Sequence, residues 1–147
     1  MADPGMIGKT FEFTWPVERG KIAELVAAIG DPNPMYHDSV KAQDEGYPGI
    51  VAPPTFSTVA VLWTGVLFKA FEKLKIPLNR ILHAEQSYEY YNPILAGDTL
   101  TGVLEVKAIT ERQGKVGTLV YVMLETVYNN QNDQKVLKEN MLIVERR

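Results

Sequence analysis

Residues 53–74 read PPTFSTVAVLWTGVLFKAFEKL, a segment that opens with two prolines and is apolar almost all round. Proline suits the first turn of a helix because the N–H group that it lacks would have no partner there. The pattern therefore predicts one long helix over residues 54–74. A helix that is apolar on every side should be buried rather than laid on a surface. Charged residues return from Lys69 onward, where we expect the helix to leave the core.

The chain after this helix has the pattern of strands. Four runs of alternating or β-branched residues are separated by short turn signals rich in glycine, asparagine and aspartate. The runs are about 10–14 residues long, whereas a usual strand has five or six. Long antiparallel strands and one buried helix predict an α+β fold in which a sheet wraps around that helix. The expected strands cover residues 80–91, 99–112, 116–129 and 135–145.

Upstream of the buried helix, the sequence predicts three shorter elements. Residues 9–15 alternate polar and aromatic side chains, which is typical of a strand. Residues 18–29 carry apolar side chains at helical spacing, and Gly30 is well placed to end that helix. Asp38 can cap a short helix that runs to about residue 45, because its carboxylate can accept from the free N–H groups of the first turn.

The composition is that of an ordinary globular protein, and we expect residues 1–147 to form a single domain. Of the 147 residues, 46% are hydrophobic, 22% are charged and none is cysteine, which excludes disulfides and thiolate chemistry. The formal net charge of −3 argues against a nucleic-acid partner. The longest apolar run, residues 59–68, is far shorter than the ~20 residues of a membrane span, and residues 1–6 do not resemble a signal peptide. We therefore expect a soluble, cytoplasmic protein with no membrane partner.

Residues 30–38, GDPNPMYHD, form the most specific motif in the chain. This motif resembles the Gly-Asp-x-Asn-Pro-(aliphatic)-His-x-Asp signature of the MaoC-like R-specific enoyl-thioester hydratases and dehydratases, and Ala42 matches the small residue that follows it. Further matches are GYPGI at residues 46–50, APPTF at 52–56 and NPILAGDTL at 92–100. The APPTF run is most similar to the branch called FAS1-like dehydratase or MaoC N-terminal domain.

The resemblance implies a hot-dog fold, in which a long antiparallel sheet wraps around a buried central helix. It also implies acyl-thioester chemistry on an acyl-CoA or acyl-ACP substrate, without a cofactor. Members of the FAS1-like branch often serve as the non-catalytic half of a two-part hydratase. Hot-dog domains generally pair through their sheets, so we expect a homodimer or a heterodimer with a catalytic MaoC-like chain.

One position departs from the family signature. The catalytic histidine of the family lies five residues after the aspartate, and that position is Tyr36 here. Asp38 lies seven residues after Asp31, as in the family, so no residue has been inserted. The histidine is therefore replaced by tyrosine, and His37 stands at the variable position of the signature.

The candidate catalytic residues are Asp31, Tyr36 and His37. Adding water to an enoyl thioester requires a base for the water, a proton for the α-carbon and donors for the enolate oxygen. In the family the aspartate and the histidine share the first two tasks. A tyrosine, with a reference pKa of about 10, is a poor base at neutral pH, although it could orient a water or a carbonyl. Asp31 could instead stabilise a turn, and His37 could be an ordinary exposed loop residue.

The start of the long helix is the candidate substrate-binding region. Free N–H groups and the helix dipole favour negative charge there, and the resemblance places the thioester carbonyl near residues 49–55. Two prolines in this segment lack N–H groups, so the donors must come from their neighbours. Alternatively, the segment simply opens a core helix. The candidate substrate-binding residues are Asn33, which matches a loop-supporting residue of the family, Gly49, where the backbone can be approached closely, and Ile50, Ala52 and Thr55.

Other patterns favour structure over a ligand site. Asp31, His37 and Asp38 share a loop, but loop spacing alone is weak ground for a metal site, and we expect none. The apolar face of the long helix could line an acyl tunnel, although such stripes usually belong to a core. The aromatic run is expected to pack the sheet or to face a partner; it comprises Tyr88, Tyr90 and Tyr91.

These observations leave several functions open. The chain could be a hydratase subunit whose active site is completed by a different MaoC-like chain, and Tyr36 is the main support for this reading. It could be a self-sufficient homodimeric hydratase that uses Asp31 with His37 or Tyr36, which the intact Gly-Asp-x-Asn-Pro run supports. It could also be a non-catalytic module that binds acyl thioesters. A hot-dog thioesterase is disfavoured, because its usual carboxylate on the long helix is missing before Glu72.

Overall fold

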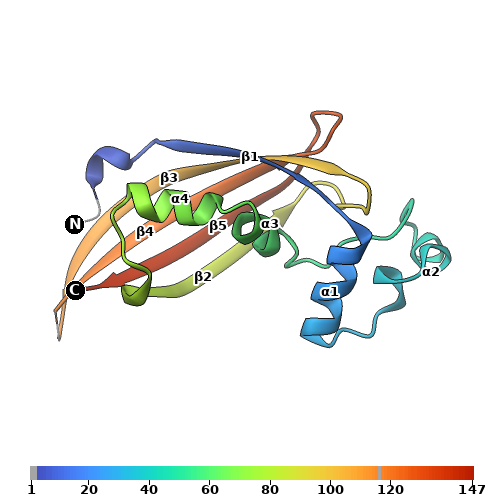
Figure 1. Cartoon of the computed structure of the whole chain (residues 1–147), viewed down its shortest axis with the longest axis horizontal. Helices are drawn as coiled ribbons and strands as arrows, with labels where there is room; N and C mark the ends of the chain where they lie inside the picture. Colours follow the sequence, from blue (N-terminus) through green and yellow to red (C-terminus); the bar gives the residue numbers. More distant parts are fainter. Residues whose placement is uncertain (1–2, 116) are drawn as a thin grey trace.

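The computed structural model describes residues 3–115 and 117–147 and has an α+β fold built on one antiparallel sheet (Figure 1). Residues 1–2 and 116, which belong to the predicted domain and to the predicted strand over residues 116–129, lie outside the described residues. The sheet has the strand order β1-β3-β4-β5-β2, so β1 and β2 are its edges. The strands are β1 (Thr10–Pro16), β2 (Ile81–Tyr90), β3 (Thr99–Gly114), β4 (Gly117–Asn129) and β5 (Lys135–Arg146). The helices are α1 (Arg19–Ile29), α2 (Ser39–Asp44), α3 (Ser57–Trp63) and α4 (Val66–Lys73), with short 3-10 helices η1 (Pro4–Met6), η2 (Pro34–Tyr36) and η3 (Leu78–Arg80).

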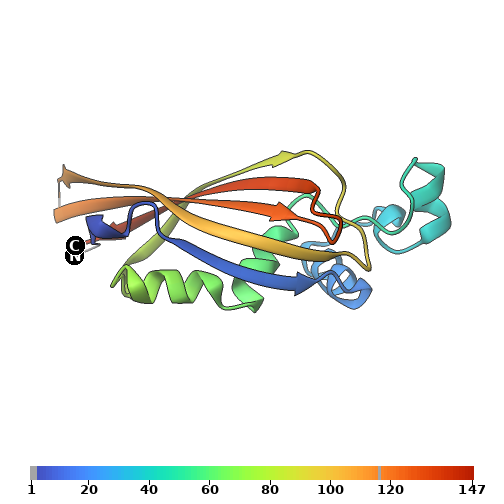
Figure 2. The same ribbon diagram turned by 90° about the horizontal axis from the view of Figure 1, so that it is seen from above.

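The sheet is covered on one face. Figure 2 shows α3 and α4 along one side of the curved strands, while α1 and α2 lie beyond one end of the sheet. In β4 the side chains of Val120, Val122 and Leu124 are buried, whereas the residues between them are partly exposed. The described part of the chain places no helix on the opposite face. This arrangement confirms the predicted hot-dog architecture, with a long sheet wrapped around a central helical segment.

The prediction of one helix over residues 54–74 is wrong, because the segment forms two helices. Gly65 separates α3 from α4 with φ at +71°. Glycine adopts a positive φ readily, and that conformation does not fit within an α-helix. The Thr64 hydroxyl also donates to the Ala60 carbonyl at 2.8 Å, a side-chain bond that tends to bend a helix.

The burial predicted for this segment holds on its inner side only. Leu62 is 45% exposed, Trp63 is 64% exposed and Phe68 is 45% exposed. Trp63 and Phe68 lie away from the sheet, which covers the helices from one direction, whereas Leu62 lies at the border between α3 and the strands. The Lys21 ammonium lies 3.8 Å from the centroid of a Trp63 ring and gives it a cation–π contact. An apolar surface therefore remains on the outer side of α3 and α4.

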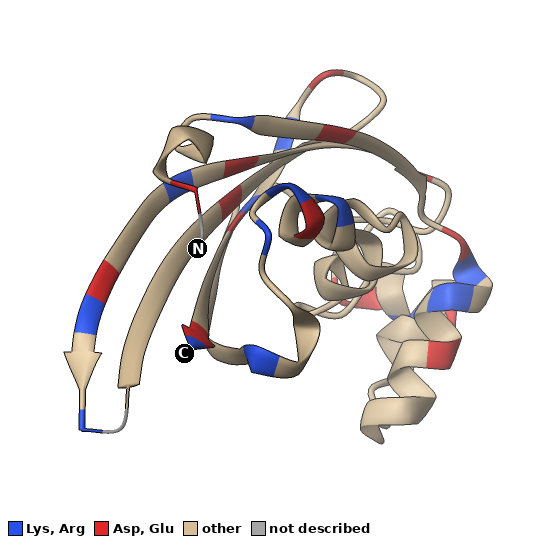
Figure 3. Cartoon of the chain, turned by 60° about the vertical axis from the view of Figure 1, so that its left-hand side comes forward, with Lys and Arg blue, Asp and Glu red and all other residues tan. Residues whose placement is uncertain are grey.

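The other predicted elements are confirmed, with small shifts of their ends. α1 ends at Gly30, whose φ of +69° is the left-handed conformation that glycine favours after a helix. Asp38 caps α2, because its Oδ1 accepts from the N–H groups of Val40 at 2.8 Å and Lys41 at 3.3 Å. No helix in residues 3–115 or 117–147 has the length and apolar character to cross a bilayer. Basic and acidic residues are interspersed over the strands and helices in the view of Figure 3.

Gly102 in β3 makes room for an aromatic contact that joins three strands. It pairs with Phe13 in β1 and with Tyr128 in β4. The Phe13 ring lies directly over the glycine, because a Cβ atom at Gly102 would be only 2.2 Å from a carbon of that ring. The same ring meets Tyr128 edge-on, with the ring centroids 5.7 Å apart and an interplanar angle of 82°. The pair ties the edge strand β1 to the core.

A polar cluster lies inside this core around Glu139 of β5, which is 1% exposed. Its Oε2 accepts from the Tyr128 hydroxyl at 3.1 Å, and its Oε1 accepts from the side-chain amide of Gln86. Among the described residues, no ion pair includes Glu139. Burial raises the pKa of its carboxyl above the ordinary value, and the hydrogen bonds from neighbouring side chains offset only part of that rise.

We expect Gly102→Ala to lower the free energy of unfolding by about 1–3 kcal/mol, because the added methyl group would displace the Phe13 ring. Urea denaturation followed by circular dichroism measures this change. Gly20→Ala in α1 is the matched control, since a Cβ atom there would meet nothing within 4 Å and alanine favours a helix. An unchanged Gly102→Ala protein would contradict the close approach of the ring.

Glu139 should make the protein less stable as the pH rises. A carboxyl with a higher pKa in the folded than in the unfolded chain keeps its proton longer when folded, so the folded state binds more protons between the two values. The free energy of unfolding should therefore fall as the pH rises from near the ordinary value of 4.5 toward the raised pKa. Urea denaturation of wild type and Glu139→Gln from about pH 4 to about pH 8 tests this. The stability difference should move in favour of glutamine as the pH rises, and a constant difference would contradict the prediction.

Candidate functional site

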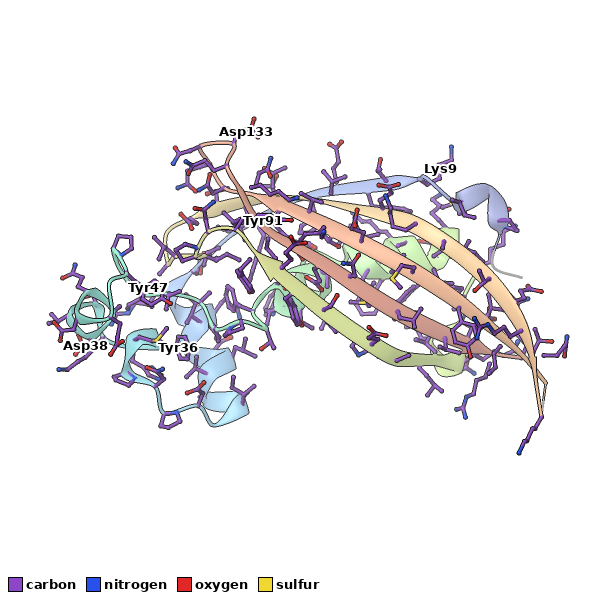
Figure 4. The ribbon with its side chains drawn as sticks, turned by 180° about the vertical axis from the view of Figure 1, so that it is seen from behind. Lys9, Tyr36, Asp38, Tyr47, Tyr91 and Asp133 are labelled. Carbon is purple, nitrogen blue, oxygen red and sulfur yellow. The ribbon has the colours of Figure 1, made fainter. Side chains whose placement is uncertain are left out.

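A pocket of about 320 Å³ lies between the loop after α1 and the end of β2. The lining is mostly apolar and consists of Met35, Tyr36, Tyr47, Val51, Ala52, Pro54, Tyr90, Tyr91, Asn92, Pro93 and Ile94. Figure 4 shows Tyr36 and Tyr47 in the region of α1 and α2, and Tyr91 where that region meets the sheet. None of the residues that line the pocket is charged. Its polar groups belong to Tyr36, Tyr47, Tyr90, Tyr91 and Asn92.

Asp31 and Asn33 shape the loop that carries Tyr36 into this pocket. Asp31 Oδ1 accepts from the N–H group of Asn33 at 2.9 Å, and Asn33 Oδ1 accepts from the N–H group of Met35 at 3.1 Å. These two side-chain turns lead into η2, where Tyr36 is 7% exposed. Asp31 therefore has a structural role in the loop. Its other oxygen, Oδ2, has no hydrogen-bond partner among the described residues.

The phenol of Tyr36 is an unusually weak acid. Burial raises its pKa above the ordinary value of 10, and the negative charge of Asp31 and the neighbouring Tyr47 raise it further. At neutral pH Tyr36 is therefore uncharged. It can donate or accept a hydrogen bond, but it cannot serve as a general base there. Asp31 lies near enough for its charge to act on the Tyr36 phenol, although Asp31 is not among the residues that line the pocket. The shared catalytic role of Asp31 and Tyr36 stays a prediction.

His37 is not part of this arrangement. Its side chain is exposed, it does not line the pocket, and no hydrogen bond of the described residues joins it to Asp31. Its backbone carbonyl accepts from Arg19 Nη2 at 2.9 Å, which ties the loop to α1. Asp38 is engaged in capping α2. Across residues 3–115 and 117–147, no three histidine, aspartate or glutamate side chains converge as metal ligands would.

The predicted substrate-binding residues near the long helix lie ahead of α3 rather than in its first turn. Ala52 lines the pocket, but its N–H group donates to the Ile94 carbonyl at 2.8 Å and is already engaged. The N–H groups of Ile50 and Thr55 have no acceptor within the described chain and remain candidate donors. Gly49 is partly buried in the approach to this segment. Neither Ile50 nor Thr55 is among the residues that line the pocket, so their role as amide donors to a thioester stays a prediction.

Sequence reasoning did not identify Tyr47 and Tyr90 as pocket residues. Tyr90 donates its hydroxyl hydrogen to the Pro54 carbonyl at 2.7 Å. Burial, and then the negative charge of Glu139, raise the pKa of Tyr90, so its phenol is also neutral. The alternation of side chains along β2 indicates the face of the sheet on which Tyr90 lies. It does not indicate which loop Tyr90 contacts. Tyr47 belongs to the GYPGI motif, which carries no further signal for its position.

A second cavity of about 220 Å³ lies farther along the sheet, beneath α3 and α4. It is almost wholly apolar. Leu67 and Phe71, from the helix face that was expected to form either a core or an acyl tunnel, line it, whereas Trp63 of the same predicted face is exposed. The lining comes from Thr58, Val61, Leu62, Leu67 and Phe71 of the helices and from Ile81, His83, Met141 and Ile143 of the strands.

Several solved structures share this fold. A chain of the HadBC (3R-hydroxyacyl-ACP dehydratase) complex from Mycobacterium tuberculosis matches with a TM-score of 0.82 and 23% identity, covering 95% of this chain and 96% of that one. The ChsH1-ChsH2 complex from the same organism matches with a TM-score of 0.72 and 26% identity, covering 94% of this chain and 83% of that one. An (R)-hydratase from A. caviae matches with a TM-score of 0.69 and 19% identity, covering 93% and 94%.

The sequence comparisons agree with the fold. A UPF0336 protein of Thermobifida fusca is 30% identical over 140 residues, which cover 94% of this chain and 90% of the relative. A UPF0336 protein of Mycobacterium leprae is 34% identical over 116 residues, which cover 76% and 69%. The family model for the FAS1-like dehydratase domain region matches residues 5–139. The chain therefore belongs to the FAS1-like dehydratase family, and it shares the hot-dog fold of the solved structures above.

Proposed function

We propose that this chain is one subunit of an R-specific enoyl-thioester hydratase, equivalently a 3-hydroxyacyl-thioester dehydratase, and that a partner chain supplies the catalytic histidine. The substrate would be an enoyl-CoA or an enoyl-ACP, to which water is added reversibly. The observation that carries the proposal is the neutral phenol of Tyr36 beside Asp31, at the position where the family signature has histidine.

The chemistry explains why this position matters. In the hydration direction, a base removes a proton from water while the water oxygen bonds to the β-carbon. The electrons of the double bond move toward the thioester oxygen to form an enolate, and the α-carbon then takes up a proton. A neutral Tyr36 can hold the water or donate to the thioester oxygen, but it cannot accept the proton of the water. The proton carrier is therefore expected on a second chain.

The surface of the chain supports a second subunit. β2 is an edge strand, and its outer side leaves backbone N–H and C=O groups without partners from this sheet. Leu82 on β2 is 43% exposed, and Leu62 on α3 is 45% exposed. The HadBC and ChsH1-ChsH2 structures are complexes. We propose that a catalytic MaoC-like chain, or a second copy of this chain, covers β2 and the outer side of α3.

A self-sufficient homodimeric hydratase is the second candidate. It is favoured by the free Oδ2 of Asp31, which could hold a water next to Tyr36 or to a rearranged His37. A non-catalytic module that binds acyl thioesters is the third. In that case the pocket would bind the thioester, and no partner chain would add hydratase activity.

The purified chain should hydrate a short enoyl-CoA no faster than its Asp31→Ala variant does, because both lack an effective base. Tyr36→His should raise the hydration rate by about 10²–10⁴-fold, the usual contribution of a positioned acid or base. Loss of the ultraviolet absorbance of the conjugated enoyl thioester measures the rate. Adding Asp31→Ala to Tyr36→His should abolish the gain, which is the control that ties it to this pair.

The opposite result separates the candidates. If the wild-type chain is active alone and Asp31→Ala removes that activity, the chain is self-sufficient and the partner proposal is wrong. Tyr36→Phe and His37→Ala would then show which residue works with Asp31. A Tyr36→His protein that stays inactive would count against the site itself.

We expect Leu62→Asp to weaken self-association or partner binding at least tenfold, or about 1.4 kcal/mol, because it places a charge in the apolar surface beside β2. Sedimentation equilibrium over a range of protein concentrations measures the effect. Val40→Asp is the matched control, since Val40 is 61% exposed on α2, away from this surface. Equal association by both variants would place the interface elsewhere.

A further inference from the structure

The two cavities lie on the same face of the sheet, one after the other along β2. The 320 Å³ pocket meets this strand at Tyr90, and the 220 Å³ cavity meets it at His83. Between them, Gln86 and Tyr88 lie on the same face, and Tyr88 pairs with Glu139 of β5. The boundary between the two largely apolar cavities is therefore polar.

The helical side of this boundary is pinned to the sheet at both ends. The Tyr90 hydroxyl donates to the Pro54 carbonyl at 2.7 Å, and the Tyr88 hydroxyl lies in a hydrogen bond with Thr58 Oγ1 at 2.9 Å. Pro54 lines the first cavity, and Thr58 lines the second. Residues 54–58 therefore run from one cavity to the other, and tyrosines of β2 hold both ends of the segment.

We propose that Tyr88, Thr58 and Glu139 form a polar partition that restricts the 320 Å³ pocket to short acyl groups. This inference rests on the proposed function, in which that pocket receives an acyl thioester. Without the partition, the two cavities would form one apolar channel along the sheet, suited to a long acyl chain. With it, the second cavity is closed to a ligand that enters from the Tyr36 side.

The cost of crossing the partition follows from its hydrogen bonds. An acyl chain that extends past Tyr90 would have to separate the Tyr88 and Thr58 hydroxyls or press against the buried Glu139 carboxyl. A methylene group offers neither a donor nor an acceptor, so the separated groups would stay unpaired in a buried place. That penalty exceeds the gain from burying one or two additional methylene groups.

The test is the chain-length profile of binding to the full chain. Isothermal titration calorimetry with CoA, butanoyl-CoA, octanoyl-CoA and dodecanoyl-CoA uses ligands that cannot react. Each methylene group buried in apolar surroundings raises the affinity about fourfold. Wild type should bind butanoyl-CoA more tightly than CoA, with an affinity that then changes by less than about twofold for the longer chains. Thr58→Val/Tyr88→Leu, which opens the partition, should bind octanoyl-CoA at least about tenfold more tightly than butanoyl-CoA.

Two further variants make the test independent of any effect that opening the partition has on folding. Thr58→Val/Tyr88→Phe replaces both partners of one hydrogen bond with groups of similar shape, so the fold should persist and a smaller gain in the same direction should appear. Tyr121→Leu is the control, because Tyr121 lies between the buried Val120 and Val122 and so faces the opposite side of the sheet. Its chain-length profile should match that of wild type.

The inference is overturned if wild-type affinity climbs with chain length as steeply as that of the opened variants. It is also overturned if the opened variants keep the flat wild-type profile. A different failure, in which no acyl-CoA binds more tightly than CoA to any variant, would overturn the proposed function itself and the inference with it. The binding of butanoyl-CoA to wild type distinguishes the two failures.

Discussion

The fold depends on covering one face of a strongly curved sheet. The inner face of β3, β4 and β5 presents buried side chains, and the segment around α3 and α4 is the cover that lies along them. The cover consists of two short helices joined at Gly65, each of which packs against a different part of the sheet. Because the helices touch the sheet on one side, their other side and the edge strand β2 stay exposed. The buried core and the proposed subunit surface therefore both follow from the packing of the helices against one face of the sheet.

The pocket beside this core is lined by uncharged residues only. Its hydroxyl groups belong to tyrosines, and two carboxylates, Asp31 and Glu139, act on Tyr36 and Tyr90 from outside the lining. Burial, and to a lesser extent the negative charge nearby, raises the pKa of both phenols, so these tyrosines stay neutral at physiological pH. Such a pocket can orient an uncharged thioester by hydrogen bonds. A neutral phenol does not take up a proton from water, so proton transfer in such a pocket would need a group of another kind.

Local signals explain which features could be predicted from the sequence. Gly30 and Asp38 each act within one turn of chain, and both end or begin a helix as predicted. The strands were predictable because their alternation extends over many residues. The break at Gly65 was not, since a glycine inside a helix costs only about 1 kcal/mol and strong apolar spacing continues on both sides. Its effect depends on the contacts that the two helices make with the sheet.

The residues of the candidate site can also be separated into those that a local sequence motif predicts and those that it does not. The motif of residues 30–38 located Asp31 and Tyr36, because both belong to one continuous loop. Tyr90 reaches that loop only through the pairing of β2 with β5, which joins residues far apart in the chain. No local sequence pattern predicts the proximity of Tyr90 to this loop. The irregular pairing between His83 and Glu85 also interrupts the alternation from which the facing of β2 side chains could be inferred.

The loop of Asp31 and Asn33 keeps its shape through side-chain oxygens that hold backbone N–H groups. Neither hydrogen bond involves the side chain at position 36, so the loop folds in the same way around a histidine or a tyrosine. Selection for correct folding alone would therefore be enough to maintain Asp31 and Asn33, whichever residue stands at position 36. A hydratase ancestor could become a scaffold through one substitution and still bear every other mark of an enzyme. A match to this motif therefore indicates common descent, whereas the residue at position 36 bears on whether a chain has a catalytic base of its own.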